Sequence, residues 1–332
     1  MTKMIMVSVK PYDQKYFEQA NQKFNLSIDY SPIHLTEETA HLFQGYSAIC
    51  IFVNDIANEK VLNILKNNGI KLIALRCAGF NNIDLECAKK LGITVCRVPE
   101  YSPQAVAEHT VGLILTLSRK YHKAYNRVKE DNFALDGLLG FNLYQKTVGI
   151  IGTGKIGLAT IKILIGFGCK VVCYDPSPNP VVNEIGAEYL PLDQVFQQAD
   201  ILSLHCPLTP QTHQLINTES IQKMKKGVCL INTSRGGLID TQAIIAALKQ
   251  KHVGYLGLDV YEQEADLFFE DLSDQIIEDD IFQRLLTFPN VLVTGHQGFF
   301  TQEALQCIAE TSLTNIQKFE AQQAIPAEFI CS

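Results

Sequence analysis

The stretch Thr147–Gly157, TVGIIGTGKIG, decides the fold that this sequence predicts. An apolar run leads directly into glycines at positions 152, 154 and 157, and a helical stretch then continues to about Gly168. Gly152 permits a tight turn, Gly154 lets the backbone approach a pyrophosphate, and Gly157 lets the helix pack on the strand. The pyrophosphate would lie at the N-terminus of the helix, where N–H groups lack partners. The stretch therefore predicts a dinucleotide-binding unit; three glycines in an ordinary turn are the alternative.

The next predicted strand, Lys170–Tyr174, indicates which dinucleotide would bind. Asp175 follows this strand, where the fold places an acid that accepts hydrogen bonds from the adenosine ribose. The residues that come next, PSPN at 176–179, contain no Arg or Lys that could hold a 2′-phosphate. The sequence therefore favours NAD(H) over NADP(H). The alternative is that Asp175 only forms the turn before Pro176.

Apolar runs on both sides of this motif predict two α/β domains with parallel sheets. Strand, helix and strand in succession, with short connections, are typical of a parallel sheet covered on both faces. The predicted strands of the first domain are Met4–Val9, Ser47–Val53, Leu72–Cys77 and Thr94–Val98. Those of the second are Thr147–Ile151, Lys170–Tyr174, Asp200–His205, Val228–Asn232, Tyr255–Asp259 and Val291–Thr294. About six parallel strands are typical of a doubly wound dinucleotide-binding fold.

A helix predicted from Pro103 to about Tyr121 joins the two domains. Its apolar residues occupy nearly every side, and a helix that is apolar all round is buried all round. Because it lies between the domains, we expect one of its sides to meet another subunit, in a homodimer or homotetramer. A last helix, from Thr301 to about Gln322, is expected to return to the first domain.

Composition and charge exclude several classes of protein. The net charge is −7 and no run is dense in Lys or Arg, which argues against a nucleic-acid-binding surface. The ten cysteines lie mostly in apolar runs without a C-x-x-C pair, so we expect buried thiols in a reducing cytoplasm and no metal site. No segment approaches the ~18 apolar residues of a membrane span, and no signal peptide is expected.

Three polar side chains follow the last three predicted strands of the second domain. They are Arg235, a glutamate within Tyr261–Glu264, and His296. Because ligands bind at the carboxyl ends of strands in α/β sheets, these side chains can converge on one crevice. Arg binds a planar carboxylate with two parallel hydrogen bonds, and His exchanges protons near neutral pH. Taken singly, a salt-bridged Arg and a surface His are the commoner interpretations.

Motifs in a fixed order carry a resemblance to a known family. They are ALRCAGFNNID (74–84), RVPEYSP (97–103), GTGKIG (152–157), YDP (174–176), SLHCPLTP (203–210), INTSRGGLID (231–240), GLDVYE (257–262) and TGHQGF (294–299). Over essentially its whole length the sequence resembles the D-isomer-specific 2-hydroxyacid dehydrogenase family, and within it the fermentative D-lactate dehydrogenases of bacteria. The acidic stretch DLFFED at 266–271 is also similar to that branch. Much of the wider family has Pro before the catalytic His, where this sequence has Gly295.

The resemblance implies a role for each matching residue. Arg235 would hold the substrate carboxylate, His296 would act as acid and base, and Glu264 would orient His296. Backbone N–H groups around Ala78 and Gly79 would also touch the carboxylate. Tyr101 and Phe299 would border the methyl end of the substrate. NAD would contact Gly152, Gly154, Lys155, Ile156, Gly157, Asp175, Cys206, Pro207, Thr212, Thr233, Ser234 and Asp259.

The resemblance also implies a domain organisation and an activity. It places a flavodoxin-like substrate-binding domain at 1–101 and 299–332, and a Rossmann NAD-binding domain at 102–298. We expect an NAD-dependent D-lactate dehydrogenase that reduces pyruvate, with no metal. The alternatives are a dehydrogenase for a larger 2-keto acid and an NAD(H)-sensing binding protein on the same scaffold. Arg76 is the alternative carboxylate clamp.

Overall fold

The structure, a computed structural model, describes residues 3–264 and 267–331. The chain forms two compact units, which divide between Ser102 and Pro103 and between Gly298 and Phe299. The first unit thus takes residues from both ends of the chain, and the second contains the glycine motif. Asp266, in the acidic stretch that resembles the D-lactate dehydrogenases, lies outside the described residues.

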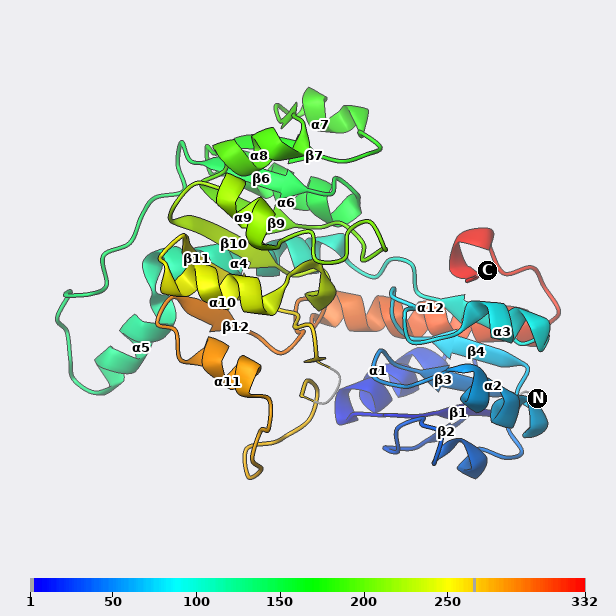
Figure 1. The fold of residues 1–332 in the computed structure, drawn as a ribbon. Coiled ribbons are helices and arrows are strands. Elements are labelled where there is room, and N and C mark those ends of the chain that lie inside the picture. The colour runs from blue at the N-terminus through cyan, green and yellow to red at the C-terminus, as the bar shows by residue number, and fades with distance from the viewer. Residues whose placement is uncertain (1–2, 265–266, 332) are drawn as a thin grey trace. The chain divides into compact units, whose positions relative to one another are not determined.

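The first unit contains a parallel sheet of five strands in the order β2-β1-β3-β4-β5 (Figure 1). The strands are β1 (Lys3–Met6), β2 (Ser27–Tyr30), β3 (Ala48–Ile51), β4 (Leu72–Leu75) and β5 (Thr94–Arg97). This 2-1-3-4-5 order is the flavodoxin-like one, so the predicted fold class is confirmed. The sequence does not predict the edge strand β2, because its four residues, SIDY, are partly polar and none of them is buried.

Helices cover both faces of this sheet. They are α1 (Pro11–Asn21), α2 (Glu59–Asn67), α3 (Leu85–Lys90) and α12 (Gln302–Glu320), with short 3₁₀ turns η1 (Ala40–Leu42) and η4 (Ala327–Phe329). The last helix, α12, packs against α1 and β4, so the chain returns to its first unit as predicted. On the other face, Val61, Leu62 and Leu65 of α2 enter the apolar core.

The second unit contains a parallel sheet of seven strands in the order β12-β11-β10-β9-β6-β7-β8. The strands are β6 (Thr147–Ile151), β7 (Lys170–Tyr174), β8 (Glu188–Tyr189), β9 (Ile201–Leu204), β10 (Val228–Asn232), β11 (Val253–Leu258) and β12 (Val291–Val293). Counted from β6, this is the Rossmann order 3-2-1-4-5-6 with one strand added. The six predicted strands are present, and β8 is too short to be recognised in the sequence.

Two layers of helices enclose this sheet. They are α4 (Pro103–Arg119), α5 (Tyr121–Lys129), α6 (Lys155–Gly166), α7 (Pro180–Glu184), α8 (Leu192–Gln198), α9 (Thr218–Lys223), α10 (Thr241–Lys249) and α11 (Asp280–Leu286), with the 3₁₀ turn η2 (Gly236–Leu238). One apolar cluster joins the sheet to α4 and α6, and a second joins it to α8, α9 and α10. No helix in the described ranges is both long and apolar enough to span a membrane.

The joining helix α4 differs from its prediction in one respect that matters for assembly. The apolar side chains Val106, Val111, Leu113, Ile114 and Leu117 are buried within the single chain, because α4 packs against α6, β10 and β11. The apolar residues from which a contact with another subunit was expected are therefore already covered within the chain. The helix also ends at Arg119 rather than at the predicted position 121, because the next residue adopts a left-handed φ of 54°.

Candidate active site

The three candidate catalytic side chains follow three neighbouring strands at one edge of the seven-stranded sheet. Arg235 comes after β10, Glu264 after β11 and His296 after β12, and the order β12-β11-β10 makes these strands neighbours. The carboxyl ends of parallel strands share one edge of the sheet, which is where ligands bind in this type of fold.

His296 and Glu264 form a pair. Nδ1 of His296 lies 2.9 Å from Oε1 of Glu264, and each side chain is about one-fifth exposed, at 17% and 20%. The backbone N–H of Tyr261 donates to the other carboxylate oxygen at 2.9 Å, which fixes the orientation of Glu264. When the carboxylate accepts a hydrogen on Nδ1, Nε2 is the ring nitrogen that could exchange a proton with a ligand. The ring of Phe269 packs against the imidazole, with 5.6 Å between the ring centroids.

The contacts of Arg235 differ from those of an arginine that only stabilises the fold, which usually pairs with a carboxylate. Its Nη1 donates to the carbonyl of Ser234 at 2.7 Å, and among the described residues its guanidinium makes no ion pair. Asn232 accepts from the N–H of Ser234 and donates to the carbonyl of Arg235, at 3.0 and 2.8 Å, so the turn that carries the arginine is fixed. A fixed turn with a cation that lacks a carboxylate partner suits the binding of an anionic substrate.

The turn that carries His296 has an unusual backbone. His296 adopts a left-handed φ of 52°, which is uncommon for a residue with a side chain. Its N–H donates to the carbonyl of Asp259 at 2.7 Å. A Cβ placed on the preceding residue, Gly295, would meet nothing within 4 Å. The absence of the proline found in much of the family therefore leaves open space before His296.

The glycine motif fits a dinucleotide. Gly152 has a φ of 96°, and a Cβ there would lie 2.6 Å from the backbone nitrogen of Cys206. A Cβ on Gly157 would lie 2.1 Å from the carbonyl oxygen of Gly152, so the helix packs on the turn as predicted. Around Gly154, by contrast, there is open space within 4 Å, and no side chain caps the helix that begins at Lys155. The first turn of α6 therefore offers its N–H groups to a phosphate.

Asp175 lies beside the glycine turn. Its Oδ2 accepts from the backbone N–H and the hydroxyl of Thr153, at 2.7 and 3.1 Å, and its Oδ1 accepts from the N–H of Ser177 at 2.8 Å. The carboxylate is thus held between the phosphate turn and the residues after β7. This place is the one at which the fold recognises a ribose.

The remaining predicted NAD contacts gather around the same edge. Ser234 donates its hydroxyl to the carbonyl of Cys206 at 2.7 Å, and Thr212 donates to that of Pro207 at 2.6 Å. The hydroxyls of Thr233 and Thr110 lie 2.8 Å apart. Burial raises the pKa of the Cys206 thiol to about 11, so this thiol stays neutral.

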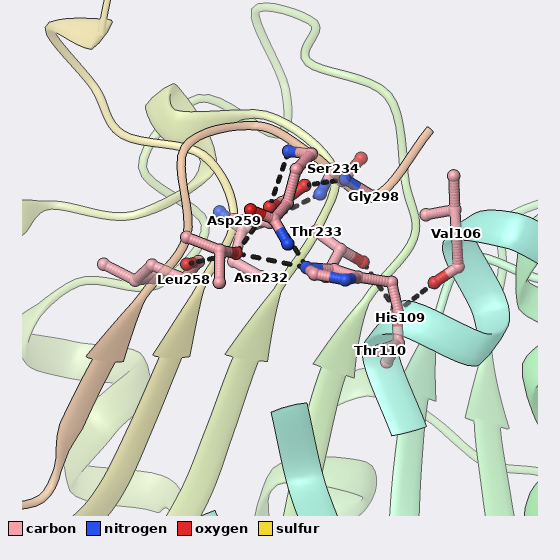
Figure 2. A network of polar contacts seen from close by, with 11 residues as sticks. Val106, His109, Thr110, Asn232, Thr233, Ser234, Leu258, Asp259 and Gly298 are labelled. Atoms are coloured by element: carbon pink, nitrogen blue, oxygen red, sulfur yellow. Dashed lines mark hydrogen bonds and ion pairs between the residues drawn. The ribbon is translucent and has the colours of Figure 1, made fainter. Parts of the chain in front are cut away.

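Asp259 is a predicted NAD contact, but its own partners in the fold cannot be predicted from the sequence. Its carboxylate accepts from the N–H groups of Gln297 and Gly298, at 2.9 and 2.8 Å, and from the hydroxyl of Thr294. It also lies 3.1 Å from Nε2 of His109, on α4 (Figure 2). The sequence suggests only local partners for His109, because nothing in it links a mid-helix histidine to an aspartate so far along the chain.

The first unit contains the remaining predicted substrate contacts. Arg97 donates to the carbonyl of Ala78 at 2.8 Å, and the thiol of Cys77 lies 3.3 Å from the carbonyl oxygen of Gly79, so the loop after β4 is fixed on both sides. Tyr101 and Phe299 pack edge to face, with 6.2 Å between ring centroids. Phe52 lies equally close to Phe299 and completes an aromatic cluster that the sequence analysis missed.

Arg76 has a structural role instead of the alternative role of carboxylate clamp. It is 1% exposed, donates to the carbonyls of Val7 and Ser8 at 3.1 and 2.9 Å, and pairs with Asp13 at 3.4 Å. Its guanidinium also stacks over the ring of Phe52 at 4.8 Å. These contacts join the ends of β1, β3 and β4 in the interior, where no substrate can reach the cation.

Comparison with known proteins decides the family. A family model described as "D-isomer specific 2-hydroxyacid dehydrogenase, NAD binding domain" matches residues 111–298. The D-lactate dehydrogenase of Escherichia coli K12 is 51% identical over 328 residues, which are 99% of this chain and 100% of that protein. The chain belongs to the D-isomer-specific 2-hydroxyacid dehydrogenase family.

Solved structures agree with this assignment. The pyruvate reductase of Chlamydomonas reinhardtii matches with a TM-score of 0.92 and 46% identity, over 98% of both chains. A D-lactate dehydrogenase from Aquifex aeolicus, in complex with NAD and lactic acid, matches with a TM-score of 0.86 and 34% identity, over 96% of both chains. As a member of this family, the chain is an NAD-dependent oxidoreductase with a Rossmann domain, as predicted.

Membership of this dehydrogenase family confirms NAD as the cofactor. The glycine turn, the uncapped start of α6 and Asp175 are the features of the second unit that fit it. Among the described residues there is no group of three or more His, Cys, Asp or Glu side chains arranged to hold a metal ion.

Proposed function

We propose that this dehydrogenase catalyses the reversible reduction of pyruvate to D-lactate. The observation that carries the proposal is the His296–Glu264 pair after β12 and β11. Arg235, whose guanidinium makes no ion pair among the described residues, follows β10, the next strand of the same sheet. The names of the similar proteins, D-lactate dehydrogenase and pyruvate reductase, support lactate and pyruvate as the substrates.

Each residue contributes one function in this proposal. Arg235 binds the substrate carboxylate through its planar guanidinium. His296 gives a proton from Nε2 to the keto oxygen during reduction and takes it back during oxidation. Glu264 keeps the hydrogen on Nδ1 and stabilises the imidazolium by its charge. NAD, when bound, supplies or accepts the hydride. The charge that develops on the keto oxygen is stabilised by Arg235 and His296.

The two units divide these tasks. The second unit, Pro103–Gly298, binds NAD through the glycine turn, Asp175 and the residues that gather at the same edge of its sheet. The first unit binds the substrate through the backbone of Ala78 and Gly79, and Tyr101 and Phe299 border the methyl group. A dehydrogenase for a larger 2-keto acid is the alternative, since the bulk of the side chain accepted depends on this aromatic cluster.

Oxidation of NADH in the presence of a panel of 2-keto acids tests the proposal. Pyruvate should give the highest kcat/KM, and chiral analysis should find only the D-isomer of lactate. A higher kcat/KM for a branched or aromatic keto acid would establish the alternative. An L-configured product would refute the proposed geometry altogether.

We also propose that the enzyme forms at least a homodimer in the cytoplasm. The proposal of a dimer is supported by an exposed apolar segment that follows α5. In this segment the side chains of Phe133, Leu135 and Leu139 are 70%, 80% and 87% exposed. Figure 1 shows this segment standing away from the sheet of its own unit. Apolar side chains so exposed are typical of a surface that another protein covers. The ten cysteines, all of them among the described residues, form no disulfide, which supports a reducing compartment.

A further inference from the structure

His109 lies on α4, outside every motif to which the proposed chemistry is assigned. Figure 2 shows its ring reaching from that helix toward the strand ends of the second unit. Its Nε2 lies 3.1 Å from Oδ1 of Asp259 and 3.1 Å from the hydroxyl oxygen of Thr294. These partners directly follow β11 and β12. His109 therefore joins α4 to two neighbouring strand ends at the edge where the candidate catalytic residues lie.

Asp259, in turn, holds the turn that carries His296. Its carbonyl accepts the N–H of His296 at 2.7 Å, and its carboxylate accepts the N–H groups of Gln297 and Gly298. Three successive amides are thus bound to one residue. His296 has a left-handed φ of 52°, and an uncommon conformation of this kind persists only where the surroundings hold it. The direction of the imidazole therefore depends on Asp259.

The contact with His109 helps Asp259 to hold this turn as an anion. The carboxyl is 2% exposed, and burial alone would favour its neutral form. The contact with His109, together with those from Thr294 and Gln297, outweighs burial and keeps the pKa of Asp259 below its ordinary value. With the carboxyl ionised, both of its oxygens can accept the amides of the turn.

The packing around this contact is close. A Cβ added to Gly298 would lie 2.9 Å from Oδ2 of Asp259 and 3.4 Å from Cδ2 of His109. A side chain at position 298 would therefore push against both partners. Because residue 298 is a glycine, the turn can pack directly against Asp259 and His109.

We propose that His109 is a positioning residue for the reaction, which acts through Asp259 to fix the turn that aims His296 at the substrate. The proposal rests on the proposed role of His296 as acid and base. His109 itself touches neither substrate nor product in this scheme. Its contribution is to kcat, because a misdirected proton donor slows the chemical step more than it weakens binding.

Two replacements of His109 separate positioning from loss of packing. His109→Ala removes the donor, whereas His109→Gln keeps an N–H that can reach Asp259. His252→Ala is the matched control, because His252 is also a partly buried histidine of the second unit and its Nε2 contacts the carbonyl of Met224 at 3.1 Å. Three quantities are measured in each variant: kcat and KM for pyruvate, the melting temperature, and hydrogen–deuterium exchange of the peptide 294–300.

We expect His109→Ala to lower kcat by about tenfold or more, the loss that one buried hydrogen bond to a charged group accounts for. KM for pyruvate should change much less than kcat. Exchange of the peptide 294–300 should become faster at 25 °C, well below the melting temperature. His109→Gln should restore most of kcat and slow the exchange again, while His252→Ala should resemble the wild type in both.

Two results would overturn the proposal. One is an unchanged kcat in His109→Ala, whatever the exchange of the turn. The other is a lowered kcat with wild-type exchange of the peptide 294–300, since the effect would then not pass through the turn. If the wild type reduced no 2-keto acid, the proposed function would fail instead. The exchange experiment alone would then decide whether His109 holds the turn.

Discussion

At the scale of single residues, Arg235 is the cation whose replacement is most informative. Arg235→Lys keeps the charge but removes the planar pair of donors that matches a carboxylate. We expect kcat/KM for pyruvate to fall by roughly thirtyfold to several thousandfold, equivalent to about 2–5 kcal/mol. Affinity for NADH, measured by fluorescence titration, should change little. Near-normal turnover would show that another group binds the carboxylate, and the buried Arg76 is not available for that role.

Replacement of Glu264 tests whether this carboxylate sets the pH range in which His296 donates its proton. Glu264→Gln keeps an acceptor for the hydrogen on Nδ1 of His296, 2.9 Å away, but removes the charge that stabilises the imidazolium. Reduction needs the protonated ring and oxidation needs the neutral one. The rate of reduction should therefore begin to fall at a lower pH in the variant, and oxidation should become active at a lower pH. Profiles of kcat against pH in both directions measure this, and superimposable profiles would remove Glu264 from the mechanism.

His205 makes folding stability depend on pH. Burial lowers its pKa to about 4, and its Nε2 lies 2.9 Å from the hydroxyl oxygen of Ser203. Between pH 6.5 and pH 4 the unfolded chain gains a proton here that the folded chain does not, so the free energy of unfolding falls as the pH falls. His205→Gln should lose less stability than the wild type between pH 7 and pH 5, measured by urea unfolding. His213→Gln, at an exposed site of the same unit, is the control, and parallel losses in all three proteins would contradict the prediction.

At the scale of elements, the sequence predicts the buried strands and misses those at the edges. β4 and β9 are buried along their whole length; β4 is a continuous apolar run, and β9 is interrupted only by Ser203. β2 and β8 are short edge strands whose residues are partly or fully exposed, and only pairing with β1 or β7 makes them strands. Likewise, the apolar side chains of α4 are buried against its own unit, and no local pattern distinguishes such a helix from one at a subunit interface.

The strand–turn–helix unit of β6 and α6 carries its own prediction about cofactor choice. Asp175 is fixed by Thr153 and Ser177 beside the turn, where a 2′-phosphate would meet its negative charge. NADH should therefore be preferred to NADPH, and Asp175→Ser should reduce that preference by raising kcat/KM for NADPH relative to NADH. Measurements of both cofactors at saturating pyruvate check this. Equal efficiency of the wild type with the two cofactors would refute it.

At the scale of the whole molecule, the motifs predict which residues meet at one edge but not how they are held there. Arg235, Glu264 and His296 follow from strand ends and resemblance, since parallel order places those ends together. The contact between His109 and Asp259 joins a helix to a strand end across the fold, and neither residue has a spacing that reveals the other. Contacts of this kind become visible only once the chain is folded.

The segment after α5 is apolar and exposed in the single chain, which leads to a prediction about assembly. Leu135 and Leu139 are four-fifths or more exposed, whereas the apolar side chains of α4 are already buried. If a second copy covers this segment, Leu135→Asp with Leu139→Asp should place charges in the interface and shift the mass in solution toward the monomer. Light scattering at micromolar concentration measures that mass, and Ile276→Asp is the control, since Ile276 is 91% exposed outside this segment. A wild type that is monomeric at this concentration would overturn the homodimer. A double variant with unchanged mass would locate the interface elsewhere.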